Sequence, residues 1–359
     1  MCINCAVSID KSKSDAFSEK MMTILNYGSL NLMISIGHRT GLFDVMDKMK
    51  PSTSREIADK ALLNERYVRE WLAALYTGGI LEYNTENRTY HLPVEHAEWL
   101  TRRSTPNNLA VTTQWLSLLG SVEDQIVKCF KNGGGVPYES YHRFNEVMAD
   151  ESRQNVVEPL FDVILPMMPG LVDKLASGIN VLDVGCGRGL IITELAKAYP
   201  KSNFTGYDLL EEAVSEANHN VMQLGLTNIN FFKVNAAKMD DLGKFDLITT
   251  FDAIHDQADP DAVLLNIYNA LKSDGTYFMQ DIKGSSHVHN NVNHPIAPLL
   301  YTTSTMHCMT VSLSQGGRGL GTMWGRELAC EMLKRAGFNK VEVRELSHDP
   351  INYYYIIRK

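Results

Sequence analysis

Three glycines at alternate positions, followed nineteen residues later by an acid, are the part of this sequence best suited to bind a small molecule. The run is Asp183-Val-Gly185-Cys-Gly187-Arg-Gly189, and the later acid is Asp208. A glycine has no Cβ, so the backbone can pass close to a bound ligand at these positions. A carboxylate such as that of Asp208 can accept hydrogen bonds from both hydroxyls of an unphosphorylated ribose. The pattern therefore predicts a nucleoside site.

Neighbouring positions limit which nucleoside the site can bind. A dinucleotide-binding loop would need a glycine where this sequence has Leu190, and no lysine of a phosphate-binding loop follows. Further along, Asn235 and Ala236 place one amide beside a small residue, which suits an adenine edge. Leu209 and Phe251, next to predicted strand ends, complete the expected ligand contacts. Ribose and adenine subsites without a phosphate subsite indicate an adenosine that carries some other group.

The second half of the chain alternates strands and helices, as a parallel sheet with covering helices requires. Strands are expected at 180–184, 204–207, 229–234, 245–250, 275–280, 341–345 and 353–357, and helices at 190–199, 211–224, 261–271 and 326–336. The last two strands are expected to form an antiparallel hairpin on one edge. Such a sheet binds ligands at the carboxyl ends of its strands, where the glycine loop and Asp208 both fall.

The first half reads as helical, with one compact motif between residues 50 and 93. Thr53 and Glu56 form a capping box before a short helix, and Asn64 can cap a second helix. A glycine pair at 78–79 ends that helix, and strands are expected at 80–83 and 89–92. The second helix has an apolar face made of Val68, Trp71, Leu72 and Leu75. Two helices followed by a hairpin make a winged helix-turn-helix.

The charges argue against DNA as the partner of this motif. Residues 52–79 carry four positive and four negative side chains, and the whole chain has a net charge of −8. Neutralising phosphates requires an excess of basic residues. The face around Trp71 is therefore interpreted as packing, in its own core or against a second copy of the chain. We expect a homodimer and no nucleic-acid partner, with a DNA-binding regulator that senses an adenosine ligand as the alternative.

The region between the two halves is expected to be helical at 107–131 and 138–173, with a break at the glycines 133–135. Tyr138 and His142, in an aromatic cluster after this break, are candidates for binding a small-molecule acceptor, and packing between domains is the alternative. His287, His289 and His294 could hold a metal, but their spacing matches no metal motif and their polar flanks favour a loop. No metal is expected.

The cysteine content and the hydropathy of the chain indicate in which cellular compartment the protein is expected. Six cysteines are scattered over 359 residues, which favours a reducing environment over a disulfide framework. Cys2 and Cys5 lie in a polar N-terminal stretch and are interpreted as part of a solvated tail rather than a zinc or redox site. The first fifteen residues lack the basic and apolar segments expected of a signal peptide, and no apolar run approaches the length of a membrane helix. We expect a cytoplasmic protein with no membrane contact.

From about Gly178 to its C-terminus the chain resembles the class I S-adenosylmethionine-dependent methyltransferases, which carry an acid, a Gly-x-Gly-x-Gly loop and a second acid. With the winged helix included, it is similar to small-molecule O-methyltransferases of a bacterial and invertebrate branch. The resemblance implies a seven-stranded Rossmann-like α/β sheet with an N-terminal, mostly α winged-helix domain that dimerises. It also implies S-adenosylmethionine as cofactor, and domains at 1–103, 104–177 and 178–359, the middle one roofing the site.

His255, in the stretch 251–260, falls where these enzymes carry a His-Asp pair and implies a general base. An imidazole with a pKa near ~6.5 can take a proton from a hydroxyl at neutral pH. Asp256 could orient the ring, but adjacent side chains rarely face one another, so an acid elsewhere is the alternative. A histidine that only caps a helix or packs on the cofactor stays open, as does a thiol acceptor, which needs a base less.

Overall fold

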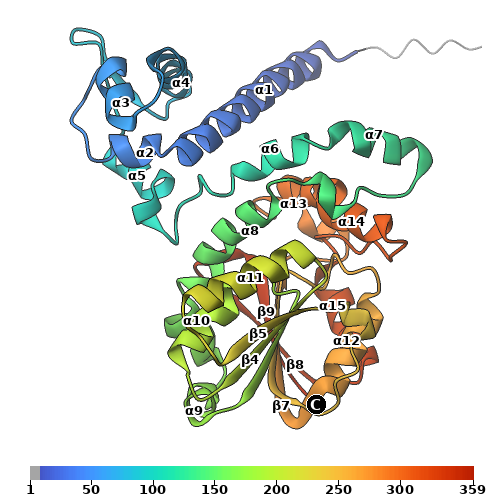
Figure 1. Ribbon diagram of the computed structural model, residues 1–359. Helices are drawn as coiled ribbons and strands as arrows, with labels where there is room; N and C mark the ends of the chain where they lie inside the picture. The colour runs from blue at the N-terminus through green and yellow to red at the C-terminus, as the bar shows by residue number, and fades with distance from the viewer. Residues whose placement is uncertain (1–8) are drawn as a thin grey trace, which may run out of the picture. The chain divides into compact units, whose positions relative to one another are not determined.

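The computed structural model describes residues 9–359, and the chain divides into two compact units, Met1–Ser117 and Leu118–Lys359 (Figure 1). Cys2 and Cys5 therefore lie outside the described residues. The boundaries expected from the sequence at residues 103 and 177 stay predictions. We describe the two units separately.

The first unit is mostly helical and contains the expected winged helix. Its elements are α1 (Lys11–Thr40), α2 (Leu42–Met46), α3 (Ser54–Ala61), α4 (Glu65–Thr77), β1 (Glu82–Asn84), β2 (Thr89–His91), α5 (Val94–Leu100) and η1 (Arg102–Ser104). The capping box of Thr53 and Glu56 opens α3, and the side chain of Asn64 caps α4 by accepting from the Arg66 N–H. Both predicted caps are confirmed.

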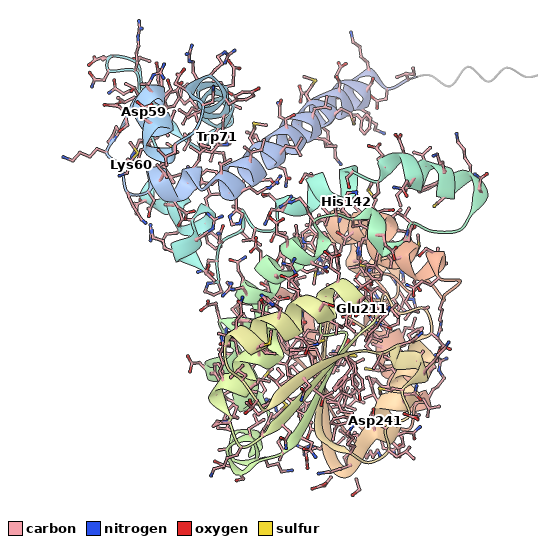
Figure 2. All side chains as sticks on the ribbon, viewed as in Figure 1. Asp59, Lys60, Trp71, His142, Glu211 and Asp241 are labelled. Carbon is pink, nitrogen blue, oxygen red and sulfur yellow. The ribbon has the colours of Figure 1, made fainter. Side chains whose placement is uncertain are left out.

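The apolar face of α4 is buried as its spacing predicts. The side chains of Val68, Trp71, Leu72 and Leu75 are each at most 3% exposed. Trp71 (Figure 2) donates from Nε1 to the carbonyl of Met33 in α1 at 2.8 Å. The hairpin begins later than expected, at Glu82 rather than residue 80, because the amides of Ile80 and Leu81 bond to the carbonyl of Leu75 and close the end of α4.

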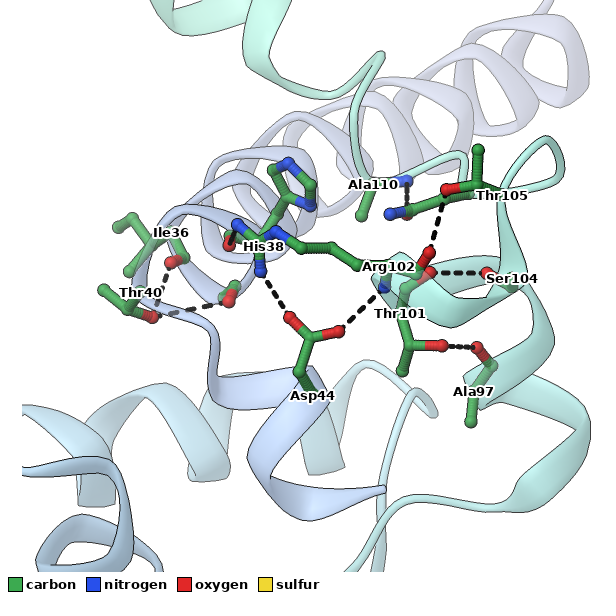
Figure 3. Close-up of polar contacts among 12 residues, drawn as sticks. Ile36, His38, Thr40, Asp44, Ala97, Thr101, Arg102, Ser104, Thr105 and Ala110 are labelled. Atoms are coloured by element: carbon green, nitrogen blue, oxygen red, sulfur yellow. Dashed lines mark hydrogen bonds and ion pairs between the residues drawn. The ribbon is translucent and has the colours of Figure 1, made fainter. Parts of the chain in front are cut away.

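Arg102 links the end of α1 to α2 through hydrogen bonds (Figure 3). The guanidinium of Arg102 donates to the Asp44 carboxylate and, at 2.7 Å, to the backbone carbonyl of His38 in the last turns of α1. The backbone N–H of Arg102 also donates to Asp44 at 2.8 Å. A positive charge at the C-terminal end of a helix is favourable, because the last carbonyls there have no partners within the helix.

The arginines on α4 are neutralised by glutamates of the same helix. Arg66 pairs with Glu70, and Arg69 donates to Glu65 from both Nε and Nη2. On α3 the oppositely charged Asp59 and Lys60 are neighbours (Figure 2). Both arginines of α4 are therefore paired within the helix, and the absence of a nucleic-acid partner stays a prediction.

The second unit is built on a seven-stranded sheet with strand order β5-β4-β3-β6-β7-β9-β8. The strands are β3 (Asn180–Val184), β4 (Asn203–Asp208), β5 (Ile229–Lys233), β6 (Phe245–Phe251), β7 (Leu271–Ile282), β8 (Lys340–Leu346) and β9 (Asp349–Arg358). All neighbours pair in parallel except β9, which is antiparallel to both β7 and β8. The predicted fold class, including the antiparallel hairpin at one edge, is confirmed.

Helices cover both faces of this sheet (Figure 1). One apolar core lies under α9 (Leu171–Ser177), α10 (Leu190–Ala198) and α11 (Glu211–Gln223), and the other lies under α12 (Pro260–Ala270) and α15 (Gly325–Arg335). The strands at the centre are buried on both faces, which explains why residues 181–184 are apolar except for Asp183. An acid in such a strand calls for a specific role.

The stretch from residue 107 to residue 173 is less regular than predicted. The expected helix at 107–131 is two helices, α6 (Gln114–Gly120) and α7 (Glu123–Asn132). The expected helix at 138–173 contains only η2 (Tyr138–Ser140), α8 (Phe144–Ser152), the π-helical turns 153–157 and 160–164, and η5 (Leu165–Met167) before α9. Prolines at 159, 166 and 169 remove the N–H groups that a continuous helix needs.

Three shorter elements follow β7 and complete the second unit. They are η7 (Val288–Asn291), α13 (Ala297–Thr303) and α14 (Met309–Ser314), with the π-helical turn η8 (Ser304–Cys308) between α13 and α14. A further short turn, η6 (Ala236–Lys238), follows β5. Within residues 9–359 no helix is both long and apolar enough to cross a membrane. The four described cysteines are free thiols, at positions 129, 186, 308 and 330. The cytoplasmic location stays a prediction.

Candidate active site

A cavity of about 350 Å³ opens at the carboxyl ends of β3, β4 and β6, where ligands bind to sheets of this kind. Its wall includes all eight residues that the sequence assigns to a cofactor: Asp183, Gly185, Gly187, Asp208, Leu209, Asn235, Ala236 and Phe251. The side chains of α8 form another part of the wall, with Phe144 and Met148. Residues that are far apart in the sequence thus line one space.

The three glycines of the loop after β3 are required for different reasons. All have positive φ, at 74° for Gly185, 52° for Gly187 and 69° for Gly189. A Cβ on Gly185 would lie 2.6 Å from the Cβ of Ala253, and one on Gly189 would lie 2.2 Å from the Phe231 ring. A Cβ on Gly187 would meet nothing within 4 Å. Only Gly187 therefore opens the backbone toward a ligand, while the other two permit close packing beneath the loop.

Asp208 fastens this loop to the end of β4. Its Oδ2 accepts from the N–H of Gly187 at 2.8 Å, and its Oδ1 accepts from the N–H of Leu210 at 2.9 Å. Burial raises the pKa of Asp208, and the N–H groups of Leu210 and Gly187 oppose that rise. Each carboxylate oxygen has a second lone pair, so both can still accept from a ribose hydroxyl.

Asp183, the acid inside β3, is also in the wall and is 3% exposed. Thr249 of β6 donates to its Oδ1 at 2.7 Å, and burial raises the pKa of Asp183 to about 7. On the far side of the cavity, Asn235 accepts from the Ala237 N–H at 3.0 Å, which caps η6 and fixes the side-chain amide of Asn235. Each of the two groups thus has a hydrogen-bond partner that orients it, Asp183 inside the sheet and Asn235 at the surface.

His255 lies behind the wall and is 3% exposed, so it does not itself line the cavity. Its Nδ1 is 2.7 Å from Oδ1 of Asp281, a residue at the end of β7 that the sequence analysis did not name. The same oxygen accepts from Trp324 Nε1 at 3.0 Å and from the Ile282 N–H at 2.8 Å. These contacts hold the His255 ring, so the partner is an acid elsewhere in the chain rather than Asp256.

The surroundings of His255 strengthen it as a base. Burial favours the neutral ring, but the Asp281 carboxylate and the Cys308 side chain outweigh burial and raise the pKa of His255 above its ordinary 6.5. Cys308 belongs to η8 and reaches the imidazole from the segment after α13. Since Nδ1 is engaged by Asp281, the second ring nitrogen, Nε2, is the one that can take a proton.

Asp256 lines the cavity beside His255 and has a different partner. Its Oδ2 accepts a hydrogen bond from the hydroxyl of Tyr138, the acceptor candidate from the roof segment. Burial raises the pKa of Asp256 to about 6, and burial likewise raises the pKa of Tyr138. Tyr138 thus lies in the cavity wall and is hydrogen-bonded to the loop that carries His255, while its role in binding an acceptor stays a prediction.

The second acceptor candidate, His142, is exposed on the loop between η2 and α8 (Figure 2) and is not in the cavity wall. The aromatic cluster forms around His307 of η8 instead. Its ring stacks on Phe144 at 4.2 Å between centroids and meets Tyr141 edge-on at 4.7 Å. Burial lowers the pKa of His307 to about 3, so this ring is neutral and acts as part of an apolar roof.

Two groups of side chains are candidates for binding a metal ion. His287 and His289 are exposed and stack on each other at 5.8 Å, and neither belongs to a metal-compatible group with His294. Among residues 9–359, only Asp252, His255 and Asp281 bring three possible ligating atoms within 4.8 Å of one another. In that group the His255 Nδ1 is already hydrogen-bonded to Asp281. The absence of a metal stays a prediction.

Two family models match the chain. Residues 28–102 match the model described as the Rv2258c-like winged HTH domain, and residues 175–339 match the methyltransferase domain model. The chain therefore combines a winged helix-turn-helix domain with a class I methyltransferase domain.

Solved structures share this architecture over nearly the whole chain. A putative O-methyltransferase from Nostoc punctiforme has a TM-score of 0.69 at 17% identity and covers 95% of this chain and 98% of its own. Human N-acetylserotonin methyltransferase, solved in complex with SAM, has a TM-score of 0.69 at 16% identity and covers 99% of each chain. At such identities the likeness shows the fold.

Curated relatives match over a shorter stretch. The ubiquinone biosynthesis O-methyltransferase of Pseudomonas aeruginosa is 28% identical over 134 residues, which is 36% of this chain and 56% of the relative. An uncharacterized protein of Rickettsia prowazekii is 31% identical over 123 residues, which is 34% of this chain and 22% of the relative. The chain thus spans between about a fifth and just over half the length of these relatives.

Proposed function

We propose that this protein is an S-adenosylmethionine-dependent methyltransferase that acts on a hydroxyl or thiol of a small molecule. The observation that carries the proposal is the cavity at the strand ends, which collects the glycine loop, Asp208, Asn235 and the loop before His255. The open space at Gly187 is where a nucleoside can approach the backbone. The matched methyltransferase domain, which covers residues 175–339, supports the same reading.

The residues present fit this cofactor. Asp208 can accept the ribose hydroxyls, Asn235 and Ala236 border the adenine position, and Gly187 leaves room for the methionine part. S-Adenosylmethionine, when bound, supplies a methyl group that is already activated on a sulfonium. The chain must then align the acceptor, exclude water and remove a proton. The aromatic roof of Phe144 and Tyr138 serves the exclusion of water.

The proton of an acceptor hydroxyl passes to Nε2 of His255. Asp281 holds the ring through Nδ1 and stabilises the imidazolium that forms, because its carboxylate carries the opposite charge. With its proton on His255, the acceptor oxygen would be ready to take the methyl group that S-adenosylmethionine supplies when bound. His255 acts as the general base, and Asp281 and Trp324 position it.

The acceptor itself can be identified by methyl labelling. The protein is incubated with S-adenosylmethionine labelled on the transferred methyl group and with a small-molecule metabolite extract, and the labelled product is identified by mass spectrometry. The proposal expects a labelled O-methyl or S-methyl compound that is absent without protein. Label found only on nucleic acid or on other proteins would contradict the assignment to small molecules.

The pH dependence of the rate should report the pair formed by His255 and Asp281. The base must be neutral to accept a proton, and its pKa lies above 6.5, so kcat/KM is expected to rise with pH through a value above ~6.5. Asp281→Asn removes the negative charge that raises this pKa, so the rising limb should move to lower pH and the maximal rate should fall. Asp240→Asn, on an exposed residue outside the cavity, should leave the limb in place. If the rising limb of the pH profile stayed in place in Asp281→Asn, the pairing of Asp281 with His255 would be contradicted.

We further propose that the protein is a homodimer formed through α1. Every residue from 9 to 27 is exposed in the single chain. That stretch includes Phe17, Met21, Ile24 and Leu25, each at least 41% exposed. An isolated helix is marginally stable in water and gains most of its stability from burying an apolar face. A second copy of the chain would supply the surface that this helix needs.

The dimer can be tested by light scattering after size exclusion. The wild type is expected at twice the chain's mass of 40.3 kDa, and the double variant Met21→Glu/Leu25→Glu at the mass of one chain, because charges would enter the apolar contact. Leu242→Glu makes the same kind of change at a residue that is 77% exposed in the second unit, and should leave the dimer intact. A monomeric wild type at micromolar concentration would refute the proposal.

A further inference from the structure

Asp252, directly after β6, lies in the cavity wall but has no role in the mechanism above. Its backbone has a φ of 50°, which few residues other than glycine adopt. Two contacts with Gln280 of β7 hold it: the Asp252 N–H donates to the Gln280 carbonyl at 3.0 Å, and the Gln280 Nε2 donates to Asp252 Oδ2 at 3.0 Å. The carboxylate is thus held in a fixed position.

The other carboxylate oxygen of Asp252, Oδ1, is buried and accepts no hydrogen bond from any residue in the described part of the chain. The neighbouring Asp281 is 0% exposed, and its Oδ2 likewise has no donor among residues 9–359. A buried carboxylate oxygen without a donor loses its hydration and gains nothing in return. Of the two residues, Asp252 belongs to the cavity wall and Asp281 does not, so Oδ1 of Asp252 is the oxygen to which a ligand in the cavity can bring a donor.

The charges around Asp252 point to a positively charged donor. Burial and the carboxylate of Asp281 raise the pKa of Asp252 to about 8, and the imidazole of His255 opposes that rise. A bound cation would lower this pKa and so favour the ionised carboxylate. The cavity wall contains five aspartates and two basic side chains, of which Arg188 is paired with Glu216 outside the wall. The wall is therefore acidic on balance.

We propose that Asp252 binds a protonated amine of a ligand in this cavity through its Oδ1. The inference rests on the proposed function, because that function supplies two sources of such an amine: the amino-acid end of S-adenosylmethionine, or an amine on the acceptor. An ammonium group at Oδ1 provides the missing hydrogen bond and offsets the excess of acid.

Asp252→Asn is the variant that removes the charge with the least disturbance. Asparagine tolerates a left-handed backbone about as well as aspartate, and its side-chain oxygen can still accept from Gln280. The matched control is Asp240→Asn, which removes one negative charge from an exposed residue outside the wall. Thermal melting of both variants checks that the fold is retained.

The first measurement tests the cofactor as the source of the amine. S-Adenosylmethionine, S-adenosylhomocysteine and 5′-methylthioadenosine, which lacks the amino-acid end, are titrated calorimetrically into each protein. If the cofactor supplies the amine, Asp252→Asn weakens the first two ligands roughly tenfold or more and leaves 5′-methylthioadenosine unchanged. A wild type that binds none of the three would refute the proposed function itself.

The second measurement tests the acceptor as the source. Tyramine, which carries an amine, and 4-ethylphenol, which does not, are titrated into protein saturated with S-adenosylhomocysteine. If the acceptor supplies the amine, the wild type prefers tyramine roughly tenfold or more and Asp252→Asn loses the preference. The proposal is overturned if Asp252→Asn keeps wild-type affinity, within about twofold, for S-adenosylmethionine, S-adenosylhomocysteine and tyramine. It is also overturned if Asp240→Asn reproduces the loss.

Discussion

Replacing His255 with glutamine is expected to lower turnover with a hydroxyl acceptor by ~10²-fold or more, because the side-chain amide cannot take the proton. Glutamine is of similar size and can still hydrogen bond to Asp281, so the surrounding contacts should persist. Affinity for S-adenosylmethionine should stay within about twofold of the wild type, since His255 is not in the cavity wall.

The measurement for His255 is single-turnover methyl transfer alongside calorimetric titration of the cofactor. His255→Ala serves as a second variant, and its melting temperature shows whether a loss of activity reflects unfolding. Full turnover in a folded His255→Gln protein would leave His255 with a structural role, or would indicate a thiol acceptor that ionises without help.

Gly187→Val is expected to abolish cofactor binding. The φ of 52° at Gly187 disfavours any β-branched residue, and the new side chain would fill the space that now lies open beside the backbone. The protein should still fold, because left-handed backbone strain costs only about 1–2 kcal/mol per residue.

A matched control for Gly187→Val is available in the same unit. Gly243 has a φ of 53°, a Cβ there would also meet nothing within 4 Å, and it lies outside the cavity wall. Gly243→Val should therefore suffer the same strain and bind S-adenosylmethionine as the wild type does. Equal affinity in Gly187→Val and the wild type would remove the glycine loop from the binding site.

The local features of the site are predictable because each depends on residues that are close together in the sequence. Strand, loop and acid follow each other closely between Asn180 and Asp208, so the residue spacing itself placed them at the strand ends. The capping residues of α3 and α4 were found for the same reason. A cap is set by side chains three residues apart at most.

What the sequence could not supply are contacts between distant segments. Asp281 lies 26 residues beyond His255, on the next strand of the sheet, and nothing in its local sequence marks it as the partner. Cys308 reaches the same imidazole from a π-helical turn that no periodicity predicts. Asp252 had a weak signal, an acid at a strand end beside Phe251, but its unpartnered oxygen is visible only in three dimensions.

Residues 138–173 show where helical periodicity alone is not enough to predict the structure. Helical periodicity between residues 138 and 173 predicts a helical segment, while prolines and short π-helical turns divide it. The position of Tyr138 over the cavity depends on those breaks, because its hydroxyl reaches Asp256 from the turn before α8. His142, only four residues further, faces solvent.

Calorimetric titration of the wild-type chain with S-adenosylmethionine, beside NAD and ATP, tests the assignment of the cavity most directly. The loop around Gly187 and the acid at Asp208 predict one site per chain for S-adenosylmethionine, and no comparable heat from the two phosphorylated nucleotides. Binding of NAD or ATP in preference to S-adenosylmethionine, or no binding of S-adenosylmethionine by folded protein, would contradict it.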